Sequence, residues 1–483
     1  MLSLIATLYV PLAIFLTSVT VYLMGFNRTT KYLMTAVYFC VFGWSVFAFI
    51  LAWRGVKISS FHSELLLDPL SAIFIFATSL IMLVSLLYSY DYMKEYVRIH
   101  RIPERNLRTY YSLLTLTMFT LYMVAVSNNS FLMWAFVEAT TMITVLLVCF
   151  GKYEQTLEAA WKYLVLCVVG LGSALYGTAL IYSYIFNVTG DPYRGLLFTY
   201  LASDIRVLAP TVAALGIITI LIGYGVKAGL VPMHWWLPDA YSEAPSPVSA
   251  VLSSVVTGCG FFAIFRWALA LTPAIHEMVK PFLLAVGMAS IFLGGLSIVR
   301  QVDLKRMLAY SSVENMGIIA LGICFPPLGL AVAIMHLFNH SLIKASAFLA
   351  VGNLEYRYGR RGELHGVISD LPVLGALLLM SVLALEGTPP FSMFFSVLGT
   401  AMVIDKGWIL ALYAIGLLVS FVALITRFME VSWGRRMGKE IVINEKCPSI
   451  MIWAPILLLA TTLVLGLYVG PLMDLCWRCV GVG

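Results

Sequence analysis

The residues in this chain that could do chemistry are ionisable groups inside long apolar segments. His336, His340 and Lys344 are spaced four apart in AIMHLFNHSLIKASAFLAVG, so they share one face of a helix. Histidine exchanges protons near neutral pH, and burial weakens the preference of lysine for its charged form. Either histidine alone would be interpreted as a core residue bonded to serine or backbone. Lys344 on the same face favours a proton-conducting stripe and argues against a haem or metal at the histidines.

Glu138 and Lys227 form a second candidate pair. Glu138 lies within FLMWAFVEATTMITVLLV, where a carboxylate costs about 2.5–3.5 kcal/mol on insertion scales. Two such charges are stable when close, and separating them costs several kcal/mol. We interpret the pair as a switch that opens when a proton arrives. A static ion pair between two helices is the alternative, and the broken helix beside Lys227 favours the switch.

The segment GYGVKAGLVPMHWWLPDAYSEAPSPVS, residues 223–249, predicts a membrane helix that breaks directly after Lys227. Such a break is tolerated only where the freed backbone faces protein or a water-filled cavity, and in transporters it marks the ion site. His234, Asp239 and Glu243 lie beside the break and are candidates for an aqueous entrance. Solvated loop charges explain Asp239 and Glu243 equally well.

Two further acids are candidates of second rank. Glu314 lies in MLAYSSVENMGIIALG, and Glu386 precedes a second interruption, Gly387-Thr388-Pro389-Pro390. Lys162 and Arg266 lie near span ends, where long basic side chains reach the headgroups. We expect Arg266 to be structural.

The composition indicates a membrane protein throughout. The chain has 483 residues, of which 61% are hydrophobic and 11% charged, whereas soluble domains carry roughly 25% charged residues. A span needs about 20 apolar residues. We predict fourteen spans, with the first retained rather than cleaved as a signal, near residues 3–24, 31–53, 68–90, 111–128, 130–150, 158–186, 207–231, 247–271, 281–299, 304–324, 328–351, 373–403, 408–430 and 450–476.

The placement of basic residues predicts the orientation. With the N-terminus outside, 19 lysines and arginines fall on inside loops, 7 on outside segments and 4 within spans. This bias predicts that both termini lie on the outer face. The net charge of +6 alone would suggest an acidic partner, but in a membrane protein the arrangement of charges matters more.

The two interruptions occupy similar places in two groups of about five spans, which is the sequence trace of inverted repeats. The expected fold is an all-α polytopic membrane protein with two inverted five-helix repeats and two discontinuous helices. The expected units are residues 1–110 (helices 1–3), 111–271 (first repeat), 272–430 (second repeat) and 431–483 (helix 14).

Other chemistries find no support in the sequence. It contains no P-loop, dinucleotide fingerprint, zinc-ligand cluster or nucleophile elbow. Cys476 and Cys479 form a C-x-x-C that would suit a disulfide or half a metal site, but no second pair exists. We interpret them as ordinary residues. No cofactor and no nucleic acid is expected on this chain.

Four segments resemble signature segments of a known family: KAGLVPMHWWLPDAYSEAPSPVSAVLSS, DLKRMLAYSSVENMG, HLFNHSLIKASAFLAVG and GTPPFSMFFS. The family comprises the antiporter-like subunits of respiratory complex I, Mrp-type cation/proton antiporters and membrane-bound hydrogenases. YSSVENMG and PPFSMFFS are most similar to the branch with hydrogenases and sulfane sulfur reductases. The resemblance implies fourteen helices, with Glu138 and Lys227 in the first-half relay. It also implies that His336, His340 and Lys344 form the central and second-half relay.

Two positions depart from the family pattern. Complex I members carry a lysine in the eighth helix where this chain has Gly258, and a lysine or glutamate after the twelfth-helix break where it has Val397. Water would bridge the first gap, and Glu386 would substitute at the second. The alternative is a second half that does not conduct.

The leading hypothesis is a proton-translocating subunit, with a possible link to sodium, in a redox-driven complex of a prokaryotic inner membrane. The expected partners are other membrane and peripheral subunits, which would carry the iron–sulfur clusters or a nickel–iron site. One alternative is a subunit of an Mrp-type antiporter without redox partners. Another is a structural subunit that has lost transport.

Overall fold

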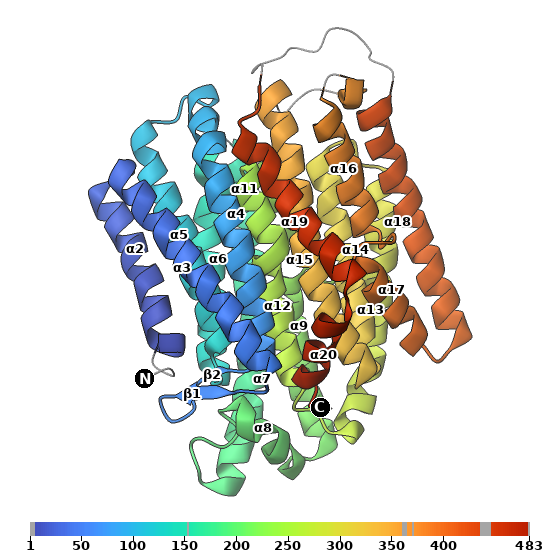
Figure 1. Ribbon diagram of the computed structural model, residues 1–483. Coiled ribbons are helices and arrows are strands. Elements are labelled where there is room, and N and C mark those ends of the chain that lie inside the picture. The colour runs from blue at the N-terminus through green and yellow to red at the C-terminus, as the bar shows by residue number, and fades with distance from the viewer. Residues whose placement is uncertain (1–4, 152–153, 360–364, 370, 435–445, 482–483) are drawn as a thin grey trace.

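A computed structural model describes residues 5–151, 154–359, 365–369, 371–434 and 446–481. These residues form a bundle of helices with one short antiparallel hairpin, β1 (Ile58–Ser60) and β2 (Leu65–Leu67) (Figure 1). The expected all-α membrane fold is confirmed.

Among the described residues, twelve helical segments are long and apolar enough to cross a membrane. Eleven are single helices or helices with a short irregular turn at one end: α2 (Val10–Met24), α3 (Arg28–Trp53), α4 (Pro69–Ile99), α5 (Leu107–Val126), α6 (Ser130–Val148), α7 (Glu154–Thr189), α9 (Pro210–Ala228), α13 (Pro273–Val299), α15 (Leu328–Tyr358), α18 (Gly407–Trp433) and α19 (Ser449–Leu467). The twelfth joins α11 (Ser246–Val251) to α12 (Thr257–Ala268) through a π-helical turn, Leu252–Val256.

Two more helical segments complete the fourteen predicted spans. One is α14 (Leu304–Ile323), which is almost entirely buried although it carries Lys305, Arg306 and Glu314. The other is the broken pair α16 (Pro372–Leu385) and α17 (Met393–Val403). Charged residues in α14 and the break between α16 and α17 lower the mean hydropathy or the length of the apolar helix. Neither feature prevents these segments from packing inside a bundle.

The two ends of the bundle differ. Both chain termini, the β-hairpin and the short helix α8 (Phe198–Asp204) lie at one end, which we call the terminus end (Figure 1). The opposite end, which we call the basic end, carries the loops 100–106 and 300–303. Residues 360–364 and 435–445, which belong to two inside loops between the predicted spans, lie outside the described residues.

The two broken helices run in opposite directions. α9 rises from the terminus end and is followed by Gly229, whereas α16 descends from the basic end and is followed by Glu386 and Gly387. Both glycines have a positive φ, 76° and 70°, which other residues rarely adopt. Opposite direction with the same break is the geometry of an inverted repeat. The unit boundaries at 110, 271 and 430 remain predictions.

The last predicted span, 450–476, is two helices. α19 ends at Leu467, and α20 (Gly470–Cys479) begins after a two-residue turn. Pro471 is compatible with the first turn of α20 but would interrupt a continuing helix. Cys476 and Cys479 therefore lie on a short separate helix, and both are free thiols.

Candidate functional site

Lys227 lies fully buried in the last turn of α9. Its Nζ donates hydrogen bonds to Thr141 Oγ1 at 2.9 Å and to Tyr163 Oη at 2.8 Å. The Tyr163 ring stacks on Trp236 of α10 (Trp236–Glu243) with centroids 4.4 Å apart. Trp236 Nε1 donates to the carbonyl of Val226 at 2.8 Å, so the ring system that supports Lys227 also satisfies backbone freed by the break.

Glu138 lies on α6, three residues before Thr141, and therefore on the same helical face. Both of its carboxylate oxygens are buried without a hydrogen-bond partner among the described residues. The structure contains no ion pair within 4.0 Å between Glu138 and Lys227, both of which it describes. Thr141 holds the lysine instead, so the predicted pair is open in this structure.

The stripe on α15 contains three fully buried groups with very different partners. His336 Nδ1 lies 3.0 Å from Ser396 Oγ, and its Nε2 lies 3.0 Å from Asn315 Oδ1. Within the described part of the chain, neither ring nitrogen of His340 has a partner. His336 is thus the satisfied core histidine considered above, whereas the ring of His340 makes no hydrogen bond to the described residues.

Lys344 completes the stripe one turn further along α15. Its Nζ donates to the carbonyl of Leu308 at 2.5 Å and to the hydroxyl of Ser311, both on α14. No carboxylate forms an ion pair with Lys344 among the residues described. Like Lys227, it is a buried lysine held by neutral oxygens.

Glu314 and Glu386, which we call the acid pair, meet at Ser420 of α18. Ser420 Oγ lies 2.5 Å from Glu314 Oε1 and 3.1 Å from Glu386 Oε2. The other oxygen of each acid is buried without a partner in the described structure. Three helices that are far apart in the sequence therefore bring two carboxyl groups to one hydroxyl.

The two halves share one local arrangement. In each, a buried lysine binds a hydroxyl that lies three residues from a glutamate: Lys227 binds Thr141 near Glu138, and Lys344 binds Ser311 near Glu314. α6 and α14 run in opposite directions (Figure 1). The order along the chain is also reversed, because the acid precedes the hydroxyl on α6 and follows it on α14. The hydroxyl consequently lies nearer the basic end in both halves.

Asp239 does not act as a free loop charge. Its carboxylate lies 3.0 Å from Lys162 Nζ of α7 and 3.0 Å from an Arg306 guanidinium nitrogen of α14. It therefore links the broken segment to both neighbouring helices at the basic end. His234 is buried with its ring stacked on Trp235 at 4.9 Å, and its Nδ1 has no partner in the described structure. Glu243 lines a cavity at the same end.

Arg266 is structural, as expected: it forms an ion pair of 2.5 Å with Asp68 at the start of α4. Sequence reasoning missed Thr141, Tyr163, Ser311 and Ser420. Uncharged hydroxyl residues are frequent in membrane helices and gave no signal, because their role depends on which charged group faces them.

The departures at positions 258 and 397 have different surroundings. A side chain at Gly258 would meet Phe74, Leu337 and Ser341 Oγ at 3.5–3.9 Å, which is ordinary contact. Val397 packs against Gly387, the residue after Glu386. The backbone next to Glu386 thus lies close to the place where the resemblance expects a charge after the break.

Within the residues that the structure describes, no group of three or more His, Cys, Asp or Glu side chains is arranged to hold a metal ion.

Comparison with known proteins places these features in a family. Residues 127–426 match the family model described as NADH:quinone oxidoreductase/Mrp antiporter, TM. The chain belongs to this family, and it is an antiporter-like membrane subunit. It is 36% identical over 386 residues to a hydrogenase-4 component F homolog of Methylacidiphilum infernorum (isolate V4), covering 78% of this chain and 80% of that protein.

Solved structures share the whole fold. A chain of the membrane-bound sulfane sulfur reductase, an archaeal respiratory membrane complex, superposes with a TM-score of 0.86 at 24% identity, covering 100% of this chain and 97% of that chain. A chain of the Mrp complex from Dietzia sp. DQ12-45-1b gives 0.85 at 21% identity, with the same coverage. Both neighbours are chains of complexes, and at these identities the likeness shows that this chain shares their fold.

Proposed function

We propose that this chain carries protons across the bilayer as a membrane subunit of a redox-driven complex. One observation carries the proposal: Lys227 is fully buried beside a helix break, held by neutral hydroxyls, while the Glu138 carboxylate lies nearby without a partner. A charged lysine and an unpartnered acid are costly in an apolar bundle. Such groups are functional by default, because a purely structural bundle gains nothing from leaving them apart.

The first half works as a switch. When Glu138 is ionised, its charge stabilises the ammonium form of Lys227 across Thr141. When Glu138 takes up a proton, that attraction is lost, and Lys227 then releases its own proton toward the centre of the chain. Tyr163 and Thr141 keep the amine in place in both states, because a hydroxyl oxygen accepts from an ammonium and a hydroxyl proton donates to a neutral amine.

The second half receives the charge through α15. His340, with both ring nitrogens unpartnered, is the central carrier, and Lys344 repeats the role of Lys227. Glu314 and Glu386 then accept the proton at the hydroxyl of Ser420. Glu386 supplies the last station that Val397 cannot, while His336 orients α15 against α14 and α17.

The relatives support a redox-driven partner. The chain is similar to a hydrogenase-4 component and to a subunit of an archaeal respiratory sulfane sulfur reductase. Iron–sulfur clusters or a nickel–iron site would then belong to peripheral partner subunits. We place the chain in a prokaryotic inner membrane, with the basic end inside and both termini outside.

A cation/proton antiporter without redox partners is the second candidate, supported by the fold shared with the Mrp complex. The subunits that copurify with the chain distinguish the two: iron–sulfur or nickel-containing partners in one case, small antiporter subunits in the other. A structural subunit without transport is the third candidate. It predicts that removing the buried charges changes assembly and leaves ion flux unaltered.

The experiment is to measure proton movement by the complex in sealed membrane vesicles. Lys227→Ala and Glu138→Gln are expected to abolish coupled movement while the complex still assembles. Lys406→Ala removes an exposed lysine at the start of α18 and is the matched control. A normal gradient in either buried variant contradicts the proposal.

A further inference from the structure

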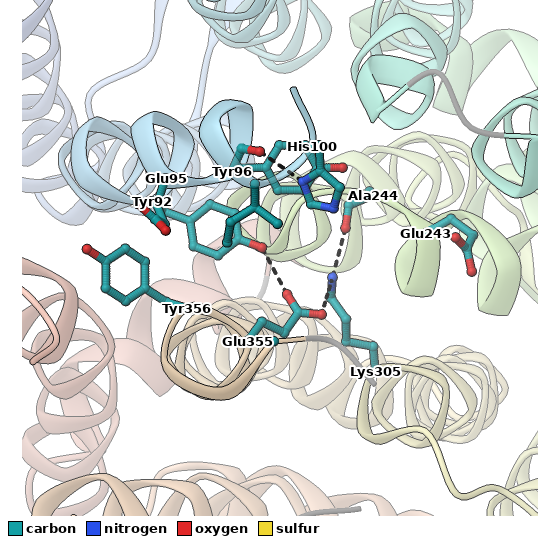
Figure 2. A pocket seen from close by; sticks show the side chains of 11 residues that line it. Tyr92, Glu95, Tyr96, His100, Glu243, Ala244, Lys305, Glu355 and Tyr356 are labelled. Carbon is teal, nitrogen blue, oxygen red and sulfur yellow. Dashed lines mark hydrogen bonds and ion pairs between the residues drawn. The ribbon is translucent and has the colours of Figure 1, made fainter. Parts of the chain in front are cut away.

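A small cavity opens at the basic end, where four segments of the chain meet. It has a volume of about 70 Å³, enough for several water molecules. The end of α4 contributes aromatic side chains, and α14 and the end of α15 contribute charged ones, as Figure 2 shows. We call it the entrance cavity; its polar lining includes Tyr92, Glu95, His100, Glu243, Lys305 and Glu355.

Glu355 is the carboxylate that connects this cavity to the interior. It accepts a hydrogen bond from Tyr92 Oη at 2.9 Å and another from the hydroxyl of Ser246. Its other oxygen lies 3.3 Å from Lys305 Nζ. Lys305 also donates to the carbonyl of Ala244 at 2.8 Å, and Figure 2 shows this chain of contacts across the cavity.

The hydroxyl of Ser246 begins a buried polar face that leads away from the cavity. Ser246, Ser249 and Ser253 follow at intervals of three and four, and all are buried, so they lie on one face of the segment. Thr257 continues this face after the π-helical turn, with its hydroxyl bonded to Tyr241 Oη. From Ser246 to Thr257 the helix rises about 16 Å, a large part of the way to the middle of the bilayer.

The far end of this polar face reaches the surroundings of Lys227. Cys259, two residues after Thr257, lies 3.9 Å from the hydroxyl of Thr140. Thr140 directly precedes Thr141, the residue that binds Lys227. At the near end, Gly352 of α15 allows close approach, because a Cβ there would meet Tyr88 Oη and Ser246 within 2.6 Å.

The charges around the cavity favour cations. Three carboxylates, Glu95, Glu243 and Glu355, and one ammonium group, Lys305, line it. Arg98, outside the lining, pairs with Glu95 and is largely exposed. A cleft lined mainly by one sign of charge raises the local concentration of the opposite ion.

We propose that the entrance cavity is where protons enter this chain, with Glu355 as the first acceptor and the α11 hydroxyls as the path toward Lys227. The inference rests on the proposed proton transport and deepens it. A proton from water binds the Glu355 carboxylate and removes its attraction for Lys305. It then passes to water or a hydroxyl on the Ser246 side, which restores the ion pair.

The experiment measures proton movement and redox turnover by the assembled complex in sealed vesicles. Glu355→Gln keeps the shape and one acceptor oxygen but cannot carry a proton, so movement is expected to fall about tenfold or more. Glu355→Asp keeps the carboxylate and should retain more movement than Glu355→Gln. Glu430→Gln, on a half-exposed acid of α18 at the same end, is the matched control and should behave as the unaltered protein.

A second measurement leaves Glu355 intact. Ile99 is an exposed apolar residue that lines the cavity, so Ile99→Cys treated with a bulky thiol reagent should close it. Proton movement is expected to fall on treatment, and the unaltered protein treated in the same way should lose none of its movement.

The outcomes separate the two proposals. If Lys227→Ala stops proton movement while Glu355→Gln and the blocked Ile99→Cys variant move protons at the normal rate, the entrance is elsewhere and the proposed function stands. If Lys227→Ala leaves movement intact, the proposed function fails whatever Glu355 does.

Discussion

Glu314 and Glu386, which are 72 positions apart in the sequence, share one hydroxyl: Ser420 Oγ lies 2.5 Å from the first carboxyl group and 3.1 Å from the second. A hydroxyl has one proton to donate, so it satisfies one of the two acids fully at any time. Two ionised carboxyl groups sharing a site repel each other, which favours a single proton held between them. We therefore infer that the acid pair holds and releases one proton.

We predict that Glu386→Gln lowers proton movement by the assembled complex about tenfold, because the amide cannot exchange the proton. Ser420→Ala should also lower proton movement, but by less, since both acids remain. Movement in sealed vesicles, divided by redox turnover, is the measurement. Thr426→Ala removes an exposed hydroxyl from the same helix and is the control. Unchanged coupling in Glu386→Gln would mean that the second half does not conduct through this acid.

His336 and His340 are predicted to respond in opposite ways to replacement by leucine. His336→Leu leaves Asn315 and Ser396 without their ring partners, which costs about 1–3 kcal/mol of folding free energy. His340→Leu removes a ring that makes no hydrogen bond to the described residues, so stability should stay the same or rise by about 1 kcal/mol.

Proton movement should show the reverse order, with His340→Leu the more damaging change. The melting temperature of the purified complex and movement in vesicles are the two measurements. Equal losses of stability in both variants would show that the contacts of His340 stabilise the fold as much as those of His336.

Tyr163→Phe is predicted to weaken the support of Lys227. The lysine keeps Thr141 but loses the 2.8 Å bond to Tyr163 Oη, and a lost bond to a buried charge costs about 1.5–3 kcal/mol. The complex should melt at a lower temperature and couple less efficiently. Tyr176→Phe, on an exposed tyrosine of the same helix, should change neither property.

Gly258 tests whether the missing lysine of the eighth helix matters. Gly258→Ala is expected to assemble and move protons within about twofold of normal, because the added Cβ makes ordinary contacts and the helix gains about 0.5–1 kcal/mol. Gly258→Lys starts a long cationic side chain against the apolar residues Phe74 and Leu337. We expect it to reduce the amount of assembled complex in membranes, measured against the unaltered chain. Full assembly with faster proton movement would mean instead that the proton path lacks only this group.

The sequence alone determined the fold and the identity of the costly charges. Fourteen spans, two breaks and the candidates Glu138, Lys227, His340 and Lys344 follow from apolar runs and from charges within them, because a bilayer admits few other arrangements. The prediction of a single helix for the last span was wrong, because the break before Gly470 and Pro471 lies within a run of residues that stays apolar. Hydropathy indicates which residues can lie in lipid, but it does not indicate where a helix stops and the chain changes direction.

The tertiary structure decided which neutral group faces each charge. The sequence suggested that Glu138 pairs with Lys227 and ranked Glu314 and Glu386 second. The structure instead puts Thr141 and Tyr163 on Lys227 and brings the two second-rank acids to Ser420. The physical reason is that a serine or threonine in an apolar helix looks the same in the sequence whichever way its side chain faces. Only the packing of distant helices decides whether it meets lipid or a buried charge.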